Sequence, residues 1–353
     1  MDTFLCTIYN WFKENKRELP WRQTTDPYYI WLSEIILQQT RVAQGTKYYL
    51  RFIERFPKVK DLADATEDEV LKEWQGLGYY SRARNLHYTA KYIQNELNGV
   101  FPSDYKEILR LKGVGHYTAA AIASIAYDLP YPAIDGNVYR VFSRYFGIST
   151  PIDSEKGKKE ILQVAMDLMP QQNAGFHNQA LMEFGALQCV PKSPACENCG
   201  LFDTCYAVQN NLVEKLPVKT KKIKQQDRYF YYYFIERGEI VFFEKREGDD
   251  IWKNLYQFPL FESDKLLDED EILKRDNIPF LHDCNFNIKK LSPIKKHVLS
   301  HQIILARLVF IEIQDDKCFN KKFIQVNKKD ISKFAVPRLI EEFIKDFNLD
   351  EKK

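Results

Sequence analysis

The chain has 353 residues, a formal net charge of +2 at pH 7 and an aromatic content of 14%. This length predicts two or three domains with ample chain for a sizeable core, and the near-neutral charge means that any binding to nucleic acid must come from local basic patches. No run of about eighteen apolar residues occurs, and the N-terminus shows no basic-then-apolar segment, so we expect a cytoplasmic protein with no membrane span.

The first part of the chain predicts two helices, over residues 1–17 and 28–46, separated by a Leu-Pro-Trp-Arg break. The second helix is apolar over residues 30–37 except for Ser33 and Glu34. A carboxyl group among apolar side chains has a raised pKa because burial disfavours its charged form, and a carboxyl that is neutral near pH 7 suits a general acid. The alternative is that Glu34 faces solvent on one side of the helix.

Polar and aromatic residues that follow this apolar stretch are candidates for contact with bases. Gln38, Gln39 and Thr40 are expected to continue the same helix, where they would either read base edges or form a solvated face. A capping box at residues 66–69 opens a further helix. The glycine turn after it, Gly-Leu-Gly-Tyr-Tyr-Ser-Arg, presents Tyr79, which would either wedge between bases or pack against a neighbouring helix.

A second glycine turn is followed directly by an alanine-rich helical stretch. We expect Ser103 to cap the helix that leads into this turn, which carries Lys112, Gly113 and Gly115. Glycine admits positive φ and leaves backbone N–H groups open, and at a helix N-terminus such groups can bind a phosphate. An ordinary tight turn is the alternative. Asp135 follows twenty residues later, in a Pro/Gly-punctuated loop before another helical pattern, where its charge would lie near a sugar.

Four of the seven cysteines are spaced C-x6-C-x2-C-x5-C: Cys189, Cys196, Cys199 and Cys205. The other three are scattered: Cys6, Cys284 and Cys318. This uneven distribution indicates a metal site rather than a set of disulfides. Four thiolates suit either zinc or an iron–sulfur cluster. Zinc sites usually pair two C-x2-C units and only one is present, so the spacing favours [4Fe–4S].

The composition changes after the cysteines. Residues 216–227 are basic, polar and led by a proline, and predict an interdomain linker. Beyond them, strands are expected over residues 229–236, 240–245, 286–288 and 303–313, and helices over residues 269–274 and 337–347. The second domain is therefore expected to be α+β.

Residues 295–302 of this second domain read Lys-Lys-His-Val-Leu-Ser-His-Gln. Two histidines spaced by four residues, His297 and His301, would suit zinc, but no cysteine or carboxylate lies close by in the sequence. A polar loop that faces DNA fits the composition better.

These motifs together resemble the endonuclease III superfamily of helix–hairpin–helix DNA glycosylases, whose iron–sulfur members carry the same cysteine spacing. Within it, residues 33–40, residues 76–82 and the second domain are similar to the MutY family, and the similarity spans about residues 5–345. The resemblance implies a mainly α-helical glycosylase domain at residues 1–215 with the [4Fe–4S] loop at 189–205. The linker at 216–227 would then lead to an α+β Nudix-like domain at 228–353.

The implied activity is base excision repair of DNA damage, by hydrolytic removal of adenine paired with 8-oxoguanine or guanine. The adenine would be flipped out of the duplex, Glu34 would protonate its N7, and Asp135 would stabilise or trap the oxocarbenium ion. Tyr117 and Asn137 would position the two carboxylates. Bifunctional relatives carry a nucleophilic lysine where this chain has Tyr117, so the resemblance implies a monofunctional enzyme.

The resemblance also implies binding residues. Those of the adenine pocket would be Trp21, Arg22, Leu37, Gln179 and, as a weaker candidate, Glu183. Those that contact 8-oxoguanine or DNA would be Gln39, Thr40, Tyr79, Lys112, Gly113, Gly115, Leu299, Ser300 and His301. The four clustered cysteines would hold a structural [4Fe–4S] cluster, with Lys192 near the rim of the cluster loop.

Two departures from the family bear on the second domain. Residues 249–262 lead into no glutamate-rich Nudix helix, so nucleotide hydrolysis is not expected there and 8-oxoguanine recognition is the implied role. The family's recognition loop usually reads Phe-Ser-His, whereas this chain has Leu299 in place of the phenylalanine, which weakens the expected discrimination of the lesion.

Two other functions stay open at this point. A catalytically silent protein that binds DNA lesions would use the same fold, although the presence of both Glu34 and Asp135 argues against it. An endonuclease III-type glycosylase/lyase would need an imine-forming lysine, and Tyr117 argues against that. The expected partner is double-stranded DNA, bound by a monomer in the cytoplasm at the nucleoid.

Overall fold

The structure is a computed structural model that describes residues 2–220, 225–274, 278, 280–281, 285–315, 319 and 323–350. It divides into two compact units. The first comprises Met1–Ala65 and Asn85–Lys221, and the second comprises Thr66–Arg84 and Lys222–Lys353. Part of the predicted linker (residues 221–224), Cys284 and Cys318 lie outside the described residues.

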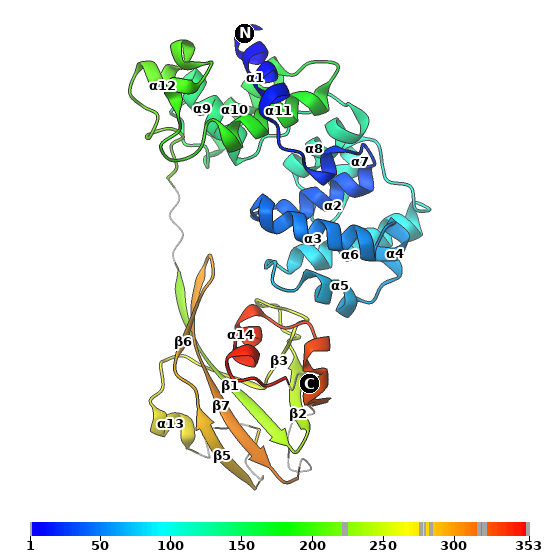
Figure 1. The fold of residues 1–353 in the computed structure, drawn as a ribbon, viewed down its shortest axis with the longest axis vertical. Coiled ribbons are helices and arrows are strands. Elements are labelled where there is room, and N and C mark those ends of the chain that lie inside the picture. The colour runs from blue at the N-terminus through cyan, green and yellow to red at the C-terminus, as the bar shows by residue number, and fades with distance from the viewer. Residues whose placement is uncertain are drawn as a thin grey trace. The chain divides into compact units, whose positions relative to one another are not determined.

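The first unit is helical (Figure 1). Its α-helices are α1 (Asp2–Asn15), α2 (Pro27–Leu37), α3 (Val42–Arg55), α4 (Val59–Asp64), α6 (Ser81–Glu96, whose first turn belongs to the second unit), α7 (Tyr105–Arg110), α8 (His116–Tyr127), α9 (Gly136–Phe146), α10 (Glu155–Leu168), α11 (Ala174–Leu187) and α12 (Tyr206–Gln209). Short 3-10 helices are η1 (Pro20–Arg22), η2 (Cys196–Asn198) and η3 (Phe202–Thr204). Among the described residues, no helix is both long enough and apolar enough to cross a lipid bilayer.

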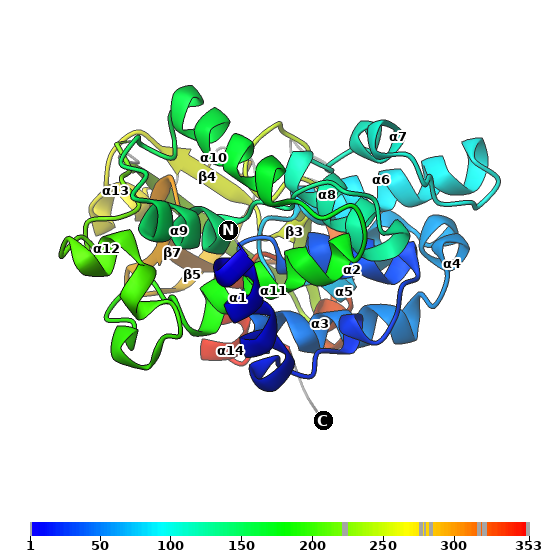
Figure 2. The same cartoon turned by 90° about the horizontal axis from the view of Figure 1, so that it is seen from above.

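The helices that carry the candidate site are positioned by the packing around α1 and by the packing around α8. Phe4, Ile8 and Phe12 of α1 are buried in a cluster with residues of α9, α10 and α11. Helix α1 lies beside α11 (Figure 2). Helix α8 contacts α2, α7 and α11, and its small buried side chains at Ala119 and Ala121 let these neighbours approach closely.

The predicted helix over residues 28–46 is wrong in one respect, because the structure has two helices there. Helix α2 ends at Leu37, and α3 begins at Val42. Between them the backbone of Gln39 adopts a left-handed φ of 54°, and the N–H of Thr40 donates to the carbonyl of Leu37. Gln38, Gln39 and Thr40, which were expected on a helix face, therefore lie in a turn. This turn contains no glycine or proline that would have indicated it in the sequence.

Helix caps were predicted with mixed success. The capping box of α5 (Glu67–Trp74) is confirmed, with Thr66 and Glu69 bonded to each other's backbone N–H groups. Ser103 does not cap α7. That position belongs to Asp104, whose carboxylate accepts from the N–H groups of Lys106 and Glu107. The correction follows the rule that a cap binds the N–H groups of the second and third helical residues.

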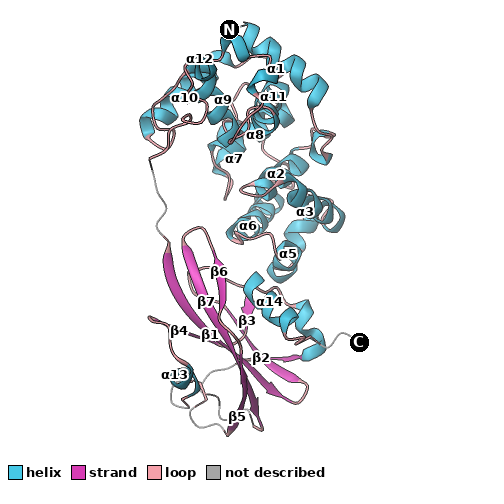
Figure 3. Ribbon diagram, turned by 60° about the vertical axis from the view of Figure 1, so that its left-hand side comes forward, coloured by secondary structure: helices cyan, strands magenta, loops and turns pink. Residues whose placement is uncertain are grey.

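The second unit combines a mixed β-sheet with helices (Figure 3). Its strands are β1 (Gln226–Arg237), β2 (Ile240–Lys245), β3 (Tyr256–Gln257), β4 (Leu260–Ser263), β5 (Phe286–Leu291), β6 (Lys295–Val298), β7 (Gln302–Ile313) and β8 (Ile324–Asn327). Its helices are α5, α13 (Glu269–Leu273), η5 (Lys328–Lys333) and α14 (Arg338–Asp346). The main path is β3-β2-β1-β7-β5, in which β1 and β7 are parallel and the other pairs antiparallel.

Strand β1 is buried on both faces, which explains its run of aromatic residues. Phe230, Tyr232 and Phe234 pack on one side with residues of α14. Tyr231, Tyr233 and Ile235 pack on the other side with Ile272 of α13. Successive side chains of a strand point to opposite faces, so a sheet covered on both sides needs a continuous apolar strand.

Candidate active site

Glu34 lies in the middle of α2 and is buried, with 8% of its surface exposed. Burial is the main cause of the raised pKa of its carboxyl, which is about 7; the nearby Tyr117 hydroxyl lowers this pKa and the charge of Asp135 raises it. The alternative of a solvent-facing Glu34 is therefore wrong, and the raised pKa expected from its apolar neighbours is confirmed.

Tyr117 in the first turn of α8 reaches the same place. Its hydroxyl donates to the sulfur of Met182 on α11 at 3.5 Å and lies close enough to the Glu34 carboxyl to lower the pKa of that group. Burial and the two neighbouring carboxyls raise the pKa of Tyr117 well above its usual value. The phenol is thus held as a neutral donor.

Asp135 is the N-cap residue of α9. Its Oδ1 accepts from the backbone N–H groups of Asn137 and Val138, each at 2.9 Å, and its Oδ2 accepts from Nδ2 of Asn137 at 2.6 Å. Burial raises the pKa of Asp135, and these three donors together with Arg140 oppose that rise. The positive end of the helix dipole favours the anion in the same place.

Arg140 fixes the orientation of the Asn137 amide, and sequence reasoning missed it. Its Nη2 donates to Oδ1 of Asn137 at 2.8 Å and to the carbonyl of Gly185 at 2.6 Å. Its Nε donates to the carbonyl of Cys189 at 2.7 Å. Because the amide oxygen is engaged by Arg140, the amide nitrogen faces Asp135. The available signal was the spacing of three residues from Asn137 along one helix face.

The predicted adenine-pocket residues are only partly brought together. The Glu183 carboxylate, which is 1% exposed, accepts from the guanidinium groups of Arg22 and Arg17 at 2.6–3.0 Å. Burial alone would raise the pKa of Glu183, but these hydrogen bonds lower it to about 2. Arg22 and Gln179 also line a common cavity of about 520 Å³. The predicted set did not include Arg17.

The other two predicted pocket residues lie elsewhere in the same unit. Trp21 is buried with its ring edge-on to Tyr49, at a centroid distance of 5.3 Å. Leu37 is the last residue of α2 and is half-buried beside Gly45, where a Cβ would lie 2.6 Å from a Leu37 methyl group.

The hairpin between α7 and α8 has the expected form. Gly113 adopts a φ of 84°, and a Cβ at this position would also lie 2.8 Å from the side chain of Asn85, so only glycine fits. Gly115 is the N-cap of α8, and a Cβ there would meet nothing within 4 Å. The ammonium of Lys112 lies over the ring of Tyr88 at 4.3 Å.

In the second unit, the structure brings Tyr79 and Ser300 together. Their hydroxyl groups are hydrogen bonded at 2.6 Å, and both residues line a cavity of about 660 Å³ together with Leu299 and His301. Gln39 and Thr40 belong to the first unit, in the turn after α2.

The expected polar loop over residues 295–302 is only partly correct. Its first half is strand β6, which pairs antiparallel with β7. Successive side chains of this strand are alternately half-buried and exposed, as expected for a strand with one covered face. The loop proper is the hairpin turn at Leu299–His301, closed by the N–H of Leu299 donating to the carbonyl of Gln302 at 2.8 Å.

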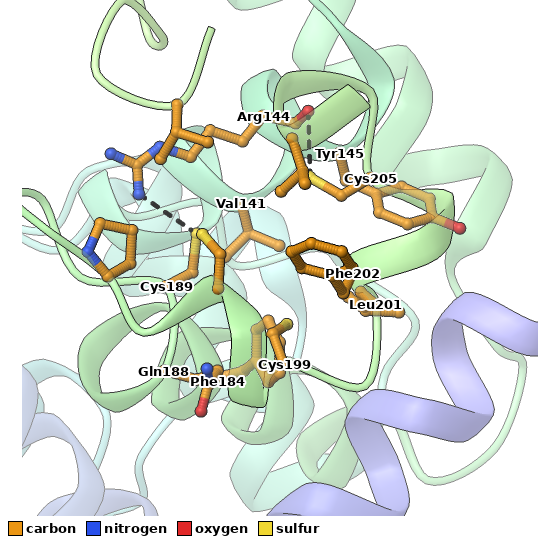
Figure 4. A pocket seen from close by; sticks show the side chains of 14 residues that line it. Val141, Arg144, Tyr145, Phe184, Gln188, Cys189, Cys199, Leu201, Phe202 and Cys205 are labelled. Atoms are coloured by element: carbon orange, nitrogen blue, oxygen red, sulfur yellow. Dashed lines mark hydrogen bonds between the residues drawn. The ribbon is translucent and has the colours of Figure 1, made fainter. Parts of the chain in front are cut away.

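The four clustered cysteines line one cavity in the first unit (Figure 4). Arg144 Nη1 donates to the Cys189 sulfur at 3.4 Å, and the Cys205 thiol donates to the Arg144 carbonyl at 3.6 Å. Burial, with neighbouring thiolate charge, raises the pKa of Cys199 to about 11, so the thiolate forms of this set call for a cationic group. In the described part of the chain, no group of three His, Cys, Asp or Glu side chains is close enough together to bind one metal ion.

Comparison with known proteins defines the class of this protein. Residues 32–170 match the family model described as HhH-GPD superfamily base excision DNA repair protein, and residues 230–346 match that of the NUDIX domain. A thermostable thymine-DNA glycosylase shares the fold at a TM-score of 0.56 and 32% identity, over 59% of this chain and 96% of that one. An endonuclease III in a DNA complex, 24% identical, aligns with a TM-score of 0.53 over 60% of this chain and 96% of that one. The protein is thus a helix–hairpin–helix DNA glycosylase of base excision repair, which acts on DNA.

Relatives over nearly the whole chain narrow this class. The adenine DNA glycosylase of Buchnera aphidicola subsp. Baizongia pistaciae is 35% identical over 98% of this chain and 97% of its own length. That of Buchnera aphidicola subsp. Acyrthosiphon pisum is 33% identical over 98% and 97%, and the human one is 38% identical over 60% of this chain and 41% of its own length. The chain belongs to the adenine DNA glycosylase family. The resemblance to MutY and the expected fold class are confirmed.

Proposed function

We propose that the protein hydrolyses the N-glycosyl bond of adenine paired with 8-oxoguanine or guanine in double-stranded DNA. The observation that carries this proposal is the pairing of Glu34 and Asp135 in unlike surroundings. The buried Glu34 has a pKa of about 7, so it holds a proton near neutral pH. Asp135 accepts three hydrogen bonds at a helix N-terminus, which favour its anion. Two carboxyl groups whose environments differ in this way can divide the roles of acid and anion.

In the proposed reaction, Glu34 gives its proton to N7 of the flipped adenine. The bond between N9 and C1′ then breaks and its electron pair leaves with the base, so positive charge develops on the sugar. Asp135 stabilises this charge or adds to C1′, and water replaces the base at C1′ with loss of a proton. Tyr117, whose hydroxyl lies near the Glu34 carboxyl, would position the acid, and Asn137 holds the anion.

The surrounding residues are proposed to bind the substrate. Arg22 and Gln179 would line the adenine pocket, with Glu183 holding the Arg22 guanidinium, and the roles of Trp21 and Leu37 stay predictions from the resemblance. The open N–H groups of the hairpin at Lys112, Gly113 and Gly115 would hold a phosphate next to the flipped nucleotide. The cavity that Arg22 and Gln179 both line supports the first assignment.

A single-turnover assay tests the proposed activity. The substrate is a duplex with one adenine opposite 8-oxoguanine, and the reaction is quenched with and without hot alkali. Strand breaks only after alkali are expected, because alkali cleaves the abasic site and Tyr117 cannot form an imine. Breaks without alkali would indicate lyase chemistry, and a lack of any product would indicate a silent binder.

Recognition of 8-oxoguanine is proposed for the second unit, with help from Gln39 and Thr40 of the first. The bonded pair of Tyr79 and Ser300 at one cavity supports this role, as does the sequence after residues 249–262, which lacks the R-E-x-x-E-E pattern of a Nudix helix. His301 is exposed on the same hairpin turn.

Replacing Ser300 by alanine should lower the preference for 8-oxoguanine over guanine about fivefold to tenfold, which corresponds to one hydrogen bond. The excision rates opposite the two bases give this ratio. Ser332→Ala is the control, because Ser332 is exposed on η5. An unchanged ratio would remove Ser300 from recognition.

The four cysteines are proposed to hold a [4Fe–4S] cluster. Such a cluster is held by four cysteine thiolates and is larger than a single metal ion. The four cysteines line one cavity, and Arg144 donates to the Cys189 sulfur, which fits a group of this size and ligand type. The cluster would supply structural support for the loop at residues 189–205. This chain's residues contribute the thiolates and the link from Arg140 to the Cys189 carbonyl.

Replacing Cys199 by serine should lower bound iron from about four atoms per chain and reduce the melting temperature. Iron analysis and the visible absorption spectrum of anaerobically purified protein measure the first effect. Cys6→Ser is the matched control, since Cys6 is exposed on α1 and should leave both quantities unchanged. Full iron content in the Cys199 variant would contradict the ligand assignment.

We also propose the domain division predicted from the sequence, with catalysis at residues 1–215, a linker at 216–227 and recognition at 228–353. One segment of the catalytic range, Thr66–Arg84, groups with the second unit. There Asp68 on α5 accepts from Lys245 Nζ and from the Tyr256 hydroxyl, both at 2.7 Å. This segment carries Tyr79, so the grouping fits a shared role in recognition.

A further inference from the structure

We propose that Trp252 is a base-contacting residue that determines specificity in the recognition cavity of the second unit. This inference rests on the proposed recognition of 8-oxoguanine. It assigns to Trp252 an aromatic contact with the base that Leu299, which lines the same cavity, cannot make.

The backbone of Trp252 is held in a conformation that large side chains rarely adopt. Its φ is +61°, and Asn254 two residues later has a φ of +66°. The left-handed region is unfavourable for residues with a bulky Cβ substituent. Such strain persists only where surrounding contacts impose it, and it is concentrated at binding sites.

Several contacts impose this conformation. Arg246 donates through Nε to the carbonyl of Ile251 at 2.7 Å and accepts, through its own carbonyl, from the N–H of Asn254 at 2.7 Å. Arg84 donates to the carbonyl of Lys253 at 2.9 Å. The loop around Trp252 is thus fixed by Arg246, the residue after β2, and by Arg84 in the first turn of α6.

The result is an indole placed at the cavity that also contains Tyr79, Leu299 and Ser300. Trp252 is half-buried and contacts His297 edge-on at a centroid distance of 5.8 Å. Among the residues that the structure describes, its indole N–H has no hydrogen-bond partner. An aromatic surface with a free donor, beside the two hydroxyl groups, is chemically suited to an oxidised purine.

The chemistry of that ligand matches the three groups. Stacking on an aromatic ring binds any base, whereas 8-oxoguanine differs from guanine by a carbonyl oxygen at C8 and an N–H at N7. The indole N–H can donate to a carbonyl oxygen, and the Ser300 hydroxyl can accept from an N–H. Leu299 and Trp252 both pack against the same core and line the same cavity, so an aromatic residue at either position would face one ligand.

The test compares excision of adenine opposite 8-oxoguanine and opposite guanine, as a ratio of kcat/KM values, in the full-length protein. Trp252→Leu should lower this ratio about tenfold through loss of the stacking contact, with the loss on the 8-oxoguanine side. Trp252→Phe should keep the ring and lose the donor, and so lower the ratio only about threefold. Lys253→Ala, which removes only an ion pair with the exposed Asp249, should leave the ratio unchanged.

A rescue experiment distinguishes contact from folding. Leu299→Phe in the Trp252→Leu background should restore most of the preference, because it returns an aromatic ring to the same cavity. An unchanged ratio in the Trp252→Leu protein, equal losses opposite both bases, or failure of the rescue would overturn the proposal.

The wild-type ratio separates this proposal from the one on which it depends. A wild-type protein without any preference for 8-oxoguanine would overturn lesion recognition and Trp252 together. A wild-type preference that Ser300→Ala diminishes and Trp252→Leu does not would leave recognition in place and overturn the role of Trp252 alone.

Discussion

Asp135→Asn is expected to reduce single-turnover excision of adenine by about a thousandfold or more while leaving affinity for DNA within about threefold. The reason is electrostatic. The reaction develops positive charge on the sugar, and a fixed charge aimed at the transition state is commonly worth 10²–10³-fold in rate for each group removed; the variant also loses any covalent route through the carboxylate. The measurement is a rapid-quench time course with enzyme in excess, beside a binding titration on the same duplex.

The fold should survive this change, because asparagine is as good an N-cap as aspartate and can still accept from the N–H groups of Asn137 and Val138. Asp104→Asn is a matched control. Asp104 caps α7 by the same two-bond geometry, without a partner such as Asn137 in the candidate site, and its replacement should leave excision unchanged. Turnover retained in the Asp135 variant would remove Asp135 from the mechanism.

The sequence predicted those parts of the site whose cause is local. Glu34 has apolar neighbours on both sides along one short helix, and that pattern alone predicts burial and a raised pKa. Asp135 precedes a helix by one position, so its capping bonds follow from a short-range rule. Gly113 needs its positive φ wherever the rest of the chain lies.

The parts that escaped prediction depend on long side chains or distant segments. Arg17 reaches a carboxylate 166 residues away, and Arg140 joins Asn137 to the end of α11. Neither residue belongs to a motif, because guanidinium groups find their partners only after the helices have packed. Tyr117 likewise comes close to Glu34 because α8 and α2 pack together.

The second unit shows the same division between local and distant causes. The hairpin of β1 and β2 was predictable from Arg237 and Gly238 at its turn, whereas the parallel pairing of β1 with β7 joins residues such as Gln226 and Gln302 and leaves no local signal. Strand β6 was read as loop because only two of its four residues are even half-buried. The sequence does not single out Trp252, because its proposed role depends on its positive φ and on its place at a cavity. Neither feature can be predicted from the local sequence.

Glu34→Gln is expected to lower the excision rate by about 10²–10⁴-fold, which is the usual contribution of a general acid. The pH dependence identifies the cause. With a pKa of about 7, wild-type activity should fall as pH rises through about 7, because the acid loses its proton, and the slow reaction of the glutamine variant should not show this fall. Glu160→Gln, at an exposed position on α10, is the control and should keep both the rate and the pH profile.

The Glu34→Gln variant should be more stable than wild type at high pH. This result would distinguish a buried carboxyl with a raised pKa from a carboxyl with an ordinary pKa. The Glu34 carboxyl has an ordinary pKa of 4.5 when the chain is unfolded and about 7 in the folded state, so wild-type stability is lost as pH rises from about 4.5 to about 7. Above that range the loss amounts to about 3 kcal/mol. Glutamine does not titrate and can still accept from Tyr117. Chemical denaturation at pH 5 and pH 8 should therefore show a small gain in the free energy of unfolding at the lower pH and a larger one at the higher. A variant that is equally stable as wild type at pH 8 would mean that Glu34 is solvated and ordinary, and the role of general acid would then fall to another group.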